Sequence, residues 1–291
     1  MLLGLADIAV VSPPTIRQKT ISYNPCIDVF FNTGLVRAVG IGSLSATCCF
    51  LSLPRVNVHV RNEAGQTILH VAAQQPDKFY VMMILLRDGP SADDCRLLDI
   101  LLRRNDIDVN MADVQGKTAF FYAVDGGHKE AVKKLLDDAR LDPNLTSHDL
   151  SPLAIVAGSG LMELLEMLLS DHRVAVNSQI HGSVDPLIWA LFQGSEGSSL
   201  RLLCAPNVNV NCCCGTMSAL MWAVILKQTE VVVEILKHDQ IDVNHRDNAG
   251  RTALMLAIEE GNDEVSMALM NRKDINLTLK NIREENALDM H

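Results

Sequence analysis

Three adjacent cysteines, Cys212 to Cys214, are the side chains of this chain best suited to chemistry. Together with Cys204 and His181 they suggest a metal site. Zinc sites, however, usually separate paired cysteines by two residues, and consecutive side chains of a strand point to opposite faces. We therefore interpret the three cysteines as small apolar filler, and we expect neither a metal nor another cofactor.

Motifs typical of catalysis do not occur in the sequence. It contains no Gly-rich phosphate loop, no His-Glu-x-x-His and no Gly-x-Ser-x-Gly. The histidines His128, His148, His172 and His238 fall at expected turns or helix ends, where a solvated imidazole is ordinary. The sequence therefore predicts a protein that is not an enzyme.

The charge of the chain is unevenly distributed. Of 291 residues with a formal net charge of -10, the first 55 hold four basic and two acidic residues, so -12 falls on residues 56–291. An acidic array repels phosphate backbones. We therefore expect no nucleic acid as a partner, and a basic or mixed protein partner instead.

The cysteine pattern and the apolar segments indicate the compartment. The eight cysteines are scattered or adjacent, which favours a reducing compartment over a disulfide framework. Residues 1–11 lack the basic start of an export signal. The uncharged run 38–54 is shorter than the roughly 18–20 apolar residues that span a bilayer. We expect no membrane association and a location in the cytoplasm, with the nucleus as the other possibility.

One phrase recurs seven times, at spacings of 33 or 34 residues after a first gap of 51. A fixed period in this range marks stacked structural repeats. A stacked array has a long binding surface and needs no catalytic pocket. The anchor position of the phrase carries threonine or a replacement for it: Thr67, Thr118, Ser151, Asp185, Ser218, Thr252 and Asn286.

The best copy of the phrase predicts two helices and a projecting hairpin. Gly250 allows the tight backbone before the anchor, and Thr252 is suited to cap a first helix, helix A. Leu254 and Ala257 share one face of that helix. A second helix, helix B, follows Gly261. Neither helix buries its apolar face alone, so stability must come from stacking.

The repeat resembles the ankyrin repeat. The family phrase Thr-Pro-Leu-His-x-Ala-Ala stands here as Thr-Ile-Leu-His-Val-Ala-Ala over Thr67–Ala73, and its Thr–His pair is kept only at Thr67 and His70. The resemblance covers about residues 56–291. It implies an all-α repeat solenoid of ankyrin repeats, about six repeats plus a terminal half-repeat over 276–291, and a monomer.

The same resemblance implies a function. Ankyrin arrays hold protein partners without chemistry of their own. The connectors Ile-Asp-Val-Asn and Leu-Asp-Pro-Asn resemble arrays of large multidomain fungal proteins, including NOD-like receptor types. The main expectation is a protein–protein interaction scaffold that binds a partner on its concave face. The alternative is a regulatory or substrate-recognition fragment of a larger protein, of the NOD-like receptor or ubiquitin-ligase adaptor type.

Two regions depart from the period. The gap of 51 leaves two candidates for the first helix B: residues 78–87, with 88–105 as an insertion, or a later segment that ends near Leu101-Leu102. We favour 78–87, because Pro76-Asp77 is typical of a helix start. Residues 1–55 show no repeat and are interpreted as an irregular cap or a linker, or as sequence from a wrong gene model.

Two groups of residues are candidates for partner binding. Counting from the anchor, positions +1, +4 and +8 share one side of helix A, and +2 and +5 face the core. Position +4 holds Tyr122, Trp189 and Trp222, either as partner anchors or as packing between repeats. Hairpin tips vary most and commonly carry specificity. Their candidate residues are Gln115, Lys117, His148, His181, Asn248 and Arg251.

Overall fold

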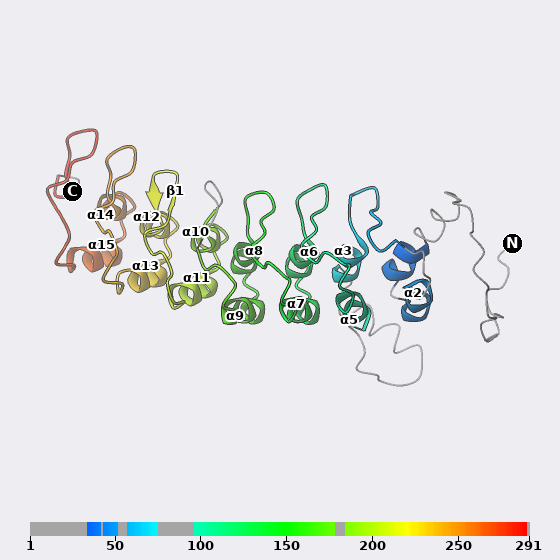
Figure 1. Ribbon diagram of the computed structural model, residues 1–291. Helices are drawn as coiled ribbons and strands as arrows, with labels where there is room; N and C mark the ends of the chain where they lie inside the picture. The colour runs from blue at the N-terminus through cyan, green and yellow to red at the C-terminus, as the bar shows by residue number, and fades with distance from the viewer. Residues whose placement is uncertain (1–33, 42, 52–56, 75–95, 178–183, 290–291) are drawn as a thin grey trace, which may run out of the picture.

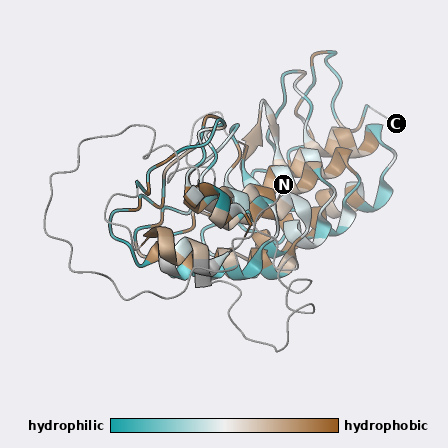
Figure 2. Ribbon diagram, turned by 90° about the vertical axis from the view of Figure 1, so that its right-hand side faces the viewer, coloured by the Kyte–Doolittle hydropathy of each residue, from teal (hydrophilic) through white to brown (hydrophobic). Residues whose placement is uncertain are grey.

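The computed structural model is a row of stacked helix pairs (Figure 1). It describes residues 34–41, 43–51, 57–74, 96–177 and 184–289. Helices A form the upper row in Figure 1, helices B form the lower row, and hairpins project beyond the upper row. The helix A row is the more apolar of the two (Figure 2). Among the described residues no helix is long and apolar enough to cross a membrane.

Each helix A begins at the anchor residue of its unit, as predicted. In unit two the Thr118 hydroxyl accepts the backbone N–H of Phe121 at 3.1 Å, which satisfies one orphan donor of the first turn. Asp185 does the same for Leu187 at 3.0 Å. Units one to six contribute α3 (Ile68–Ala73), α6 (Ala119–Asp125), α8 (Pro152–Ser159), α10 (Pro186–Phe192), α12 (Ala219–Ile225) and α14 (Ala253–Glu259).

The helices B form the second row and close the core from the other side. Buried side chains of both rows, from Leu35 to Ala287, make one continuous apolar core. This arrangement confirms an ankyrin-type all-α solenoid, in which each unit is stabilised by its neighbours. The helices B are α2 (Leu44–Leu51), α5 (Arg96–Leu102), α7 (Lys129–Leu136), α9 (Met162–Ser170), α11 (Glu196–Leu203), α13 (Thr229–Ile235) and α15 (Asp263–Met270).

The hairpins contain very little strand. In unit five, β1 (Cys213–Cys214) pairs antiparallel with β2 (Met217–Ser218), and single bridges such as Ala112 with Thr118 close others. Neighbouring hairpins are joined by backbone hydrogen bonds, for example from Val114 to the Ala64 carbonyl at 3.2 Å. The hairpins therefore stack as the helices do.

A ladder of asparagines explains the recurring Val-Asn connector. The Asn211 amide donates to the Gln240 carbonyl at 2.8 Å, and its oxygen accepts the Asp242 N–H at 2.8 Å. Because both bonds reach the next unit, the position needs a side chain that donates and accepts at once, which an amide does. The same two bonds recur at Asn110, Asn144, Asn177 and Asn244.

The described part of residues 1–55 differs from the irregular cap or linker that the sequence predicted. A helix spans 34–40, α2 follows it, and Leu35 and Val39 are fully buried in the common core. This helix pair fits the repeat period, since Thr33 precedes Thr67 by 34 residues. The apolar run showed no clean helical period because its exposed positions, such as Ile41, Cys48 and Cys49, also carry uncharged residues.

The first helix B lies later than the preferred prediction placed it. α5 packs against α3 of its own unit and between α2 and α7 of the two neighbouring units. That is the helix B place in the row, so the second candidate, ending near Leu101-Leu102, is the one observed. Residues 88–105 are therefore not all insertion, and the preferred segment 78–87 lies outside the described residues.

The end of the array also differs from expectation. Half of a seventh helix A was predicted from Asn286 onward, but the described residues 287–289 form a turn. The Asn286 side chain accepts the N–H groups of Leu288 and Asp289 at 2.8 and 3.2 Å. This is the side-chain turn that asparagine favours, and it competes with a helix start.

Candidate functional site

The base of each hairpin lies against the free side of helix A. In unit two, the ammonium of Lys117, at position -1, lies 5.3 Å from the centre of the Tyr122 ring and 3.4 Å from the Asp125 carboxylate. The Tyr122 hydroxyl donates to Asp113 of the same hairpin at 2.7 Å. Positions -1, +4 and +7 thus share one surface, which we call the hairpin-side face.

Position +1 does not belong to this face, contrary to the prediction. It is buried in all six units, whereas +7 reaches the surface. Alanine or proline at +1 packs into the core at the first helical turn, because the hairpin enters from the other side. The residues at +1 are Ile68, Ala119, Pro152, Pro186, Ala219 and Ala253.

Charge holds the hairpin to helix A in unit six as well. The guanidinium of Arg251, at -1, lies 3.1 Å from Glu259 at +7 and 2.8 Å from Asp247. Units two and six therefore carry the same device, a basic residue at -1 paired with an acidic residue at +7. The pairs are partly exposed, so each contributes little stability by itself.

Units three, four and five, which lie between units two and six, carry no charged pair at these positions. Their -1 and +7 residues are Leu150 with Gly158, Val184 with Phe192, and Met217 with Ile225. Counting +4 and +8 as well, none of the twelve residues is charged. We call this surface the neutral strip: Leu150, Ile155, Gly158, Ser159, Val184, Trp189, Phe192, Gln193, Met217, Trp222, Ile225 and Leu226.

The aromatic rings at +4 each lie against the preceding unit. Trp222 meets Phe192 edge to face, with ring centres 4.7 Å apart, and Tyr122 meets His70 in the same manner at 6.0 Å. The indole of Trp189 lies over Gly158, which leaves room for it. All three rings are half-buried, so packing between repeats is observed, and contact with a partner stays a prediction.

The indole N–H of Trp222 is a further polar group at the floor of the strip. Nε1 is buried and has no hydrogen-bond partner within the described part of the chain. An unmade hydrogen bond of this kind costs about 1–3 kcal/mol. The ring is therefore retained for its apolar packing and not for its donor in the free protein.

His70 retains the anchor network that the sequence predicted for the first unit. Its Nδ1 accepts the Thr67 N–H at 3.1 Å, and Nε2 lies 2.9 Å from the Lys117 carbonyl of the next unit. Burial lowers the pKa of His70. A neutral imidazole therefore joins the first two units next to Tyr122.

The predicted hairpin residues separate into two environments. Gln115, His148 and Asn248 are exposed at hairpin tips, whereas Lys117 and Arg251 are half-buried and ion-paired at hairpin bases. His181 lies outside the described residues. The structure therefore does not gather these candidates into one cluster, and their role in binding stays a prediction.

Position +7 is the part of the surface that the sequence reasoning missed. Phe192 and Ile225 are half-buried there, although the corresponding residues of units two and six are Asp125 and Glu259. The signal was available, because aligning the units at their anchors puts apolar residues in a column that is acidic in units two and six. It was passed over because +7 was not expected to share the face of +4.

The hairpin places the three adjacent cysteines in different surroundings. Cys212 is buried, and burial raises the pKa of its thiol well above the ordinary range. Cys213 is exposed, with its sulfur 3.9 Å from Nε2 of His245. Among the described residues no three His, Cys, Asp or Glu side chains gather in a way that would hold a metal.

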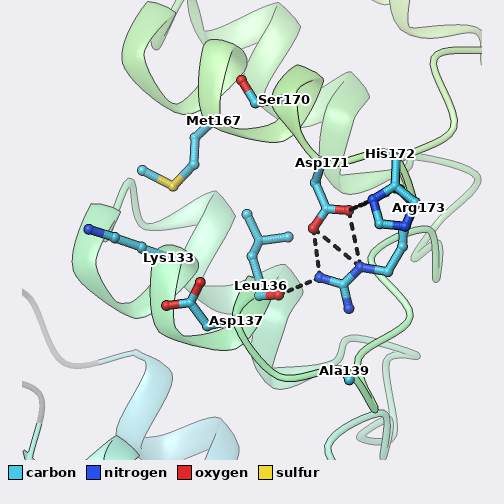
Figure 3. A pocket seen from close by; sticks show the side chains of 9 residues that line it. All are labelled: Lys133, Leu136, Asp137, Ala139, Met167, Ser170, Asp171, His172 and Arg173. Carbon is cyan, nitrogen blue, oxygen red and sulfur yellow. Dashed lines mark hydrogen bonds and ion pairs between the residues drawn. The ribbon is translucent and has the colours of Figure 1, made fainter.

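A hollow on the opposite, helix B side has a structural explanation. It lies between the ends of α7 and α9 and is lined by Lys133, Met167 and His172, among others (Figure 3). Arg173 crosses it, pairs with Asp171 and donates to the Leu136 carbonyl (Figure 3). This arrangement caps the end of α7 and uses the guanidinium of Arg173 and the carboxylate of Asp171 in that contact.

Replacing Gly158 by alanine tests the close contact between Gly158 and the indole ring of Trp189. A Cβ there would lie 2.5 Å from the indole Nε1, so the ring must move. We expect a loss of about 1 kcal/mol despite the better helix propensity of alanine. In a Trp222→Phe background, the fluorescence of Trp189 should shift to the red.

A second helical glycine provides the matched control. A Cβ on Gly197 meets only the Met162 sulfur at 3.9 Å, an ordinary contact. Gly197→Ala should therefore be neutral, or stabilise by about 0.5 kcal/mol. Equal responses of the two variants in urea unfolding would contradict the close contact between Gly158 and Trp189.

Comparison with known proteins agrees with this architecture. A family model described as Ankyrin repeats (3 copies) matches residues 35–147, 90–180 and 187–281. Among solved structures, the human ASB11 ankyrin repeat domain is similar at 24% sequence identity and a TM-score of 0.59. The similarity covers 83% of this chain and 98% of that one. The first match begins at residue 35, where the additional helix pair was found.

Proposed function

Because this chain belongs to the ankyrin-repeat family, whose repeats generally serve protein–protein interaction, we propose that it is a non-catalytic scaffold that binds a protein partner through the neutral strip. The observation that carries the proposal is the replacement of the paired charges at -1 and +7 by apolar residues in three consecutive units. Units two and six show that the fold accepts paired charges at these positions.

The composition of the strip supports this proposal. Its centre holds two tryptophans and Phe192, and aromatic anchors dominate binding energy in protein interfaces. Its two ends are bounded by the pairs Lys117–Asp125 and Arg251–Glu259. An apolar centre with a polar rim is the usual anatomy of a protein interface.

A variant that tests this proposal can be copied from another unit of the array. Val184→Lys with Phe192→Asp copies the Lys117–Asp125 pair of unit two into unit four and places charge in the strip. Because it also removes the ring that Trp222 contacts, circular dichroism must first show that the variant is folded. A photo-crosslinking residue at Gln193 then reports what lies against the strip, and one at Lys133 on the helix B side is the control. We expect a specific partner crosslinked from Gln193, weakened at least about tenfold by the double substitution.

Two results would overturn the proposal. The first is equal crosslinking from Gln193 and Lys133 to the same proteins. The second is capture from Gln193 that the double substitution leaves unchanged while the melting temperature is also unchanged. Either result would mean that the strip is buried surface of the array and not a contact for a partner.

The same strip serves the alternative setting, a recognition part of a larger protein of the NOD-like receptor or ubiquitin-ligase adaptor type. The connector phrases Ile-Asp-Val-Asn and Leu-Asp-Pro-Asn support that setting by resemblance. Co-purification of the chain with its partners distinguishes the two settings. A ubiquitin-ligase subunit bound outside the strip is expected only for the adaptor. A cytoplasmic or nuclear location, which the cysteine pattern predicts, is compatible with either.

A further inference from the structure

We infer that the neutral strip binds a single amphipathic helix of the partner, laid across units three to five with an uncharged apolar face. This inference rests on the proposed function and specifies the chemistry of the partner. Three features of the strip carry it: its repeat distance, its lack of charge and the hairpins along it.

The repeat distance of the strip matches a helix. α8, α10 and α12 pack side by side, and neighbouring helices lie about 8–10 Å apart. Seven residues of a helix rise about 10.5 Å and return to the same side after two turns. A partner helix crossing the row therefore presents residues i, i+7 and i+14 to three successive units.

A polyproline segment returns to the same side about every 9 Å, but it leaves its backbone polar groups to be desolvated against the apolar strip, whereas a helix satisfies its own. A β-strand fits the repeat distance poorly. Three residues of a strand also cover about 10 Å, but side chains alternate between opposite faces with a period of two. If one residue of such a segment met unit three, its counterpart at unit four would point away. The two tryptophans occupy the same register in adjacent units, so the strip offers equivalent contacts at a helix-compatible spacing.

The charge pattern defines the contact face of this helix. None of the twelve strip residues is charged, and the ion pairs at the ends satisfy each other within their own units. A charged side chain aimed at the strip would lose its hydration without gaining a partner. The partner helix therefore carries apolar residues toward the strip and its polar residues on the far side.

The hairpins along the strip favour a narrow occupant over a second copy of this chain. Hairpins project beyond the helix A row (Figure 1), and their bases contribute Leu150, Val184 and Met217 to the strip. A single helix, about 10 Å across, is narrow enough to lie beside the hairpins.

The experiment uses two displayed peptide libraries selected on the whole chain. One is built on a stabilised helix of about 18 residues, the other on an extended, proline-containing scaffold, each with randomised positions. Enriched clones are then tested on the Val184→Lys/Phe192→Asp variant, which takes no part in the selection. Met217→Arg/Ile225→Glu, which copies the Arg251–Glu259 pair into unit five, is the second strip variant, and Lys133→Asp on α7 is the control outside the strip.

The expected result is enrichment of helical clones with apolar residues at i, i+3 or i+4, i+7, i+11 and i+14 and no charge among them. Their affinity should fall at least tenfold in both strip variants and stay unchanged in Lys133→Asp. Enrichment of extended clones, of helical clones with charged contact positions, or of no clone sensitive to the strip overturns the inference. Extended clones sensitive to the strip would overturn the helix alone, because they still support the proposed function.

Discussion

Replacing Trp222 by alanine is expected to destabilise the protein by about 3 kcal/mol, as large aromatic-to-alanine changes in packed sites do. The ring joins units four and five through its edge-to-face contact with Phe192. It also packs against the common core. In a repeat array each unit depends on the interface with its neighbour, so the loss should separate the unfolding of the two halves of the array.

The matched variant is Trp222→Phe. It keeps an aromatic ring against Phe192 and removes the buried indole N–H that lacks an acceptor. The cost of lost area and the gain from removing an unpaired donor oppose each other, so we expect stability within about 1 kcal/mol of the wild type. Urea unfolding followed by circular dichroism measures both variants.

These two substitutions also separate packing from binding at the same residue. If Trp222→Phe were as destabilising as Trp222→Ala, the indole would have a polar partner in the free protein and the packing account would be wrong. If stability is kept in Trp222→Phe but partner affinity falls, the accessible part of the indole ring contacts the partner, because the N–H itself is buried. A half-buried ring serves both roles when one part packs against Phe192 and another part stays accessible.

The architecture could be predicted from the sequence because the contacts that define each unit are local. Anchors such as Thr118 and Ser151 accept an N–H three residues later in the same helix, so spacing alone places them. The Asn211 ladder is longer in range but repeats with the period, and therefore shows in the sequence as a recurring connector. A period of 33 or 34 residues makes each of these signals visible several times.

The misplaced elements are those in which the period is interrupted. The first helix B was preferred at 78–87 on the strength of a start signal at Pro76-Asp77, but α5 is fixed by packing between α2 and α7. The helix pair at 34–51 has Gly34 after the anchor position and an unusual apolar surface. The helix pair can be recognised as a further repeat only when it is seen to pack on the next unit.

The strip was predicted in part for a similar reason. Its tryptophans stand out by residue type, whereas Val184, Phe192, Met217 and Ile225 are ordinary core residues until their partners are known. Their meaning comes from a contact between -1 and +7, which lie eight residues apart on different elements. Only the geometry of Lys117 with Asp125 and of Arg251 with Glu259 shows that these positions meet.

Replacing Arg173 is the second change for which we expect a large loss of stability. Its guanidinium pairs with Asp171 at 2.6 Å. It also donates to the carbonyls of Leu136, Asp138 and Leu141, at the end of α7 and in the connector after it. These carbonyls include orphan acceptors of a helix C-terminus, where a cation is also favoured by the helix dipole.

Arg173→Ala should therefore cost about 3 kcal/mol, because several charge-assisted hydrogen bonds disappear together and Asp171 loses its partner. Arg173→Lys should not restore the loss, since one ammonium does not reproduce the planar fork. Arg201→Ala is the control: Arg201 also pairs with a carboxylate, Glu166, but on an exposed surface and without carbonyl contacts. It should change stability little.

The pH dependence gives this prediction a second readout. Hydrogen bonds from Arg173 hold the pKa of Asp171 below its ordinary value, against the opposing effect of burial. A carboxyl whose folded pKa is depressed contributes stability above its unfolded pKa of about 4, and that contribution is lost as the pH falls through the folded value. The difference between wild type and Arg173→Ala should therefore narrow between about pH 5 and pH 3.

Asp171→Asn separates the two parts of the contact at neutral pH. It removes the carboxylate but leaves the guanidinium free to donate to the three carbonyls, so its cost should be smaller than that of Arg173→Ala. The cost should shrink as the pH falls from about 5 to 3, because only the wild type loses the contribution of the ionised carboxylate. An Arg173→Ala difference that stayed constant from pH 7 to pH 3 would contradict the coupling to Asp171. Capping of α7 by the carbonyl contacts alone would then account for the whole effect.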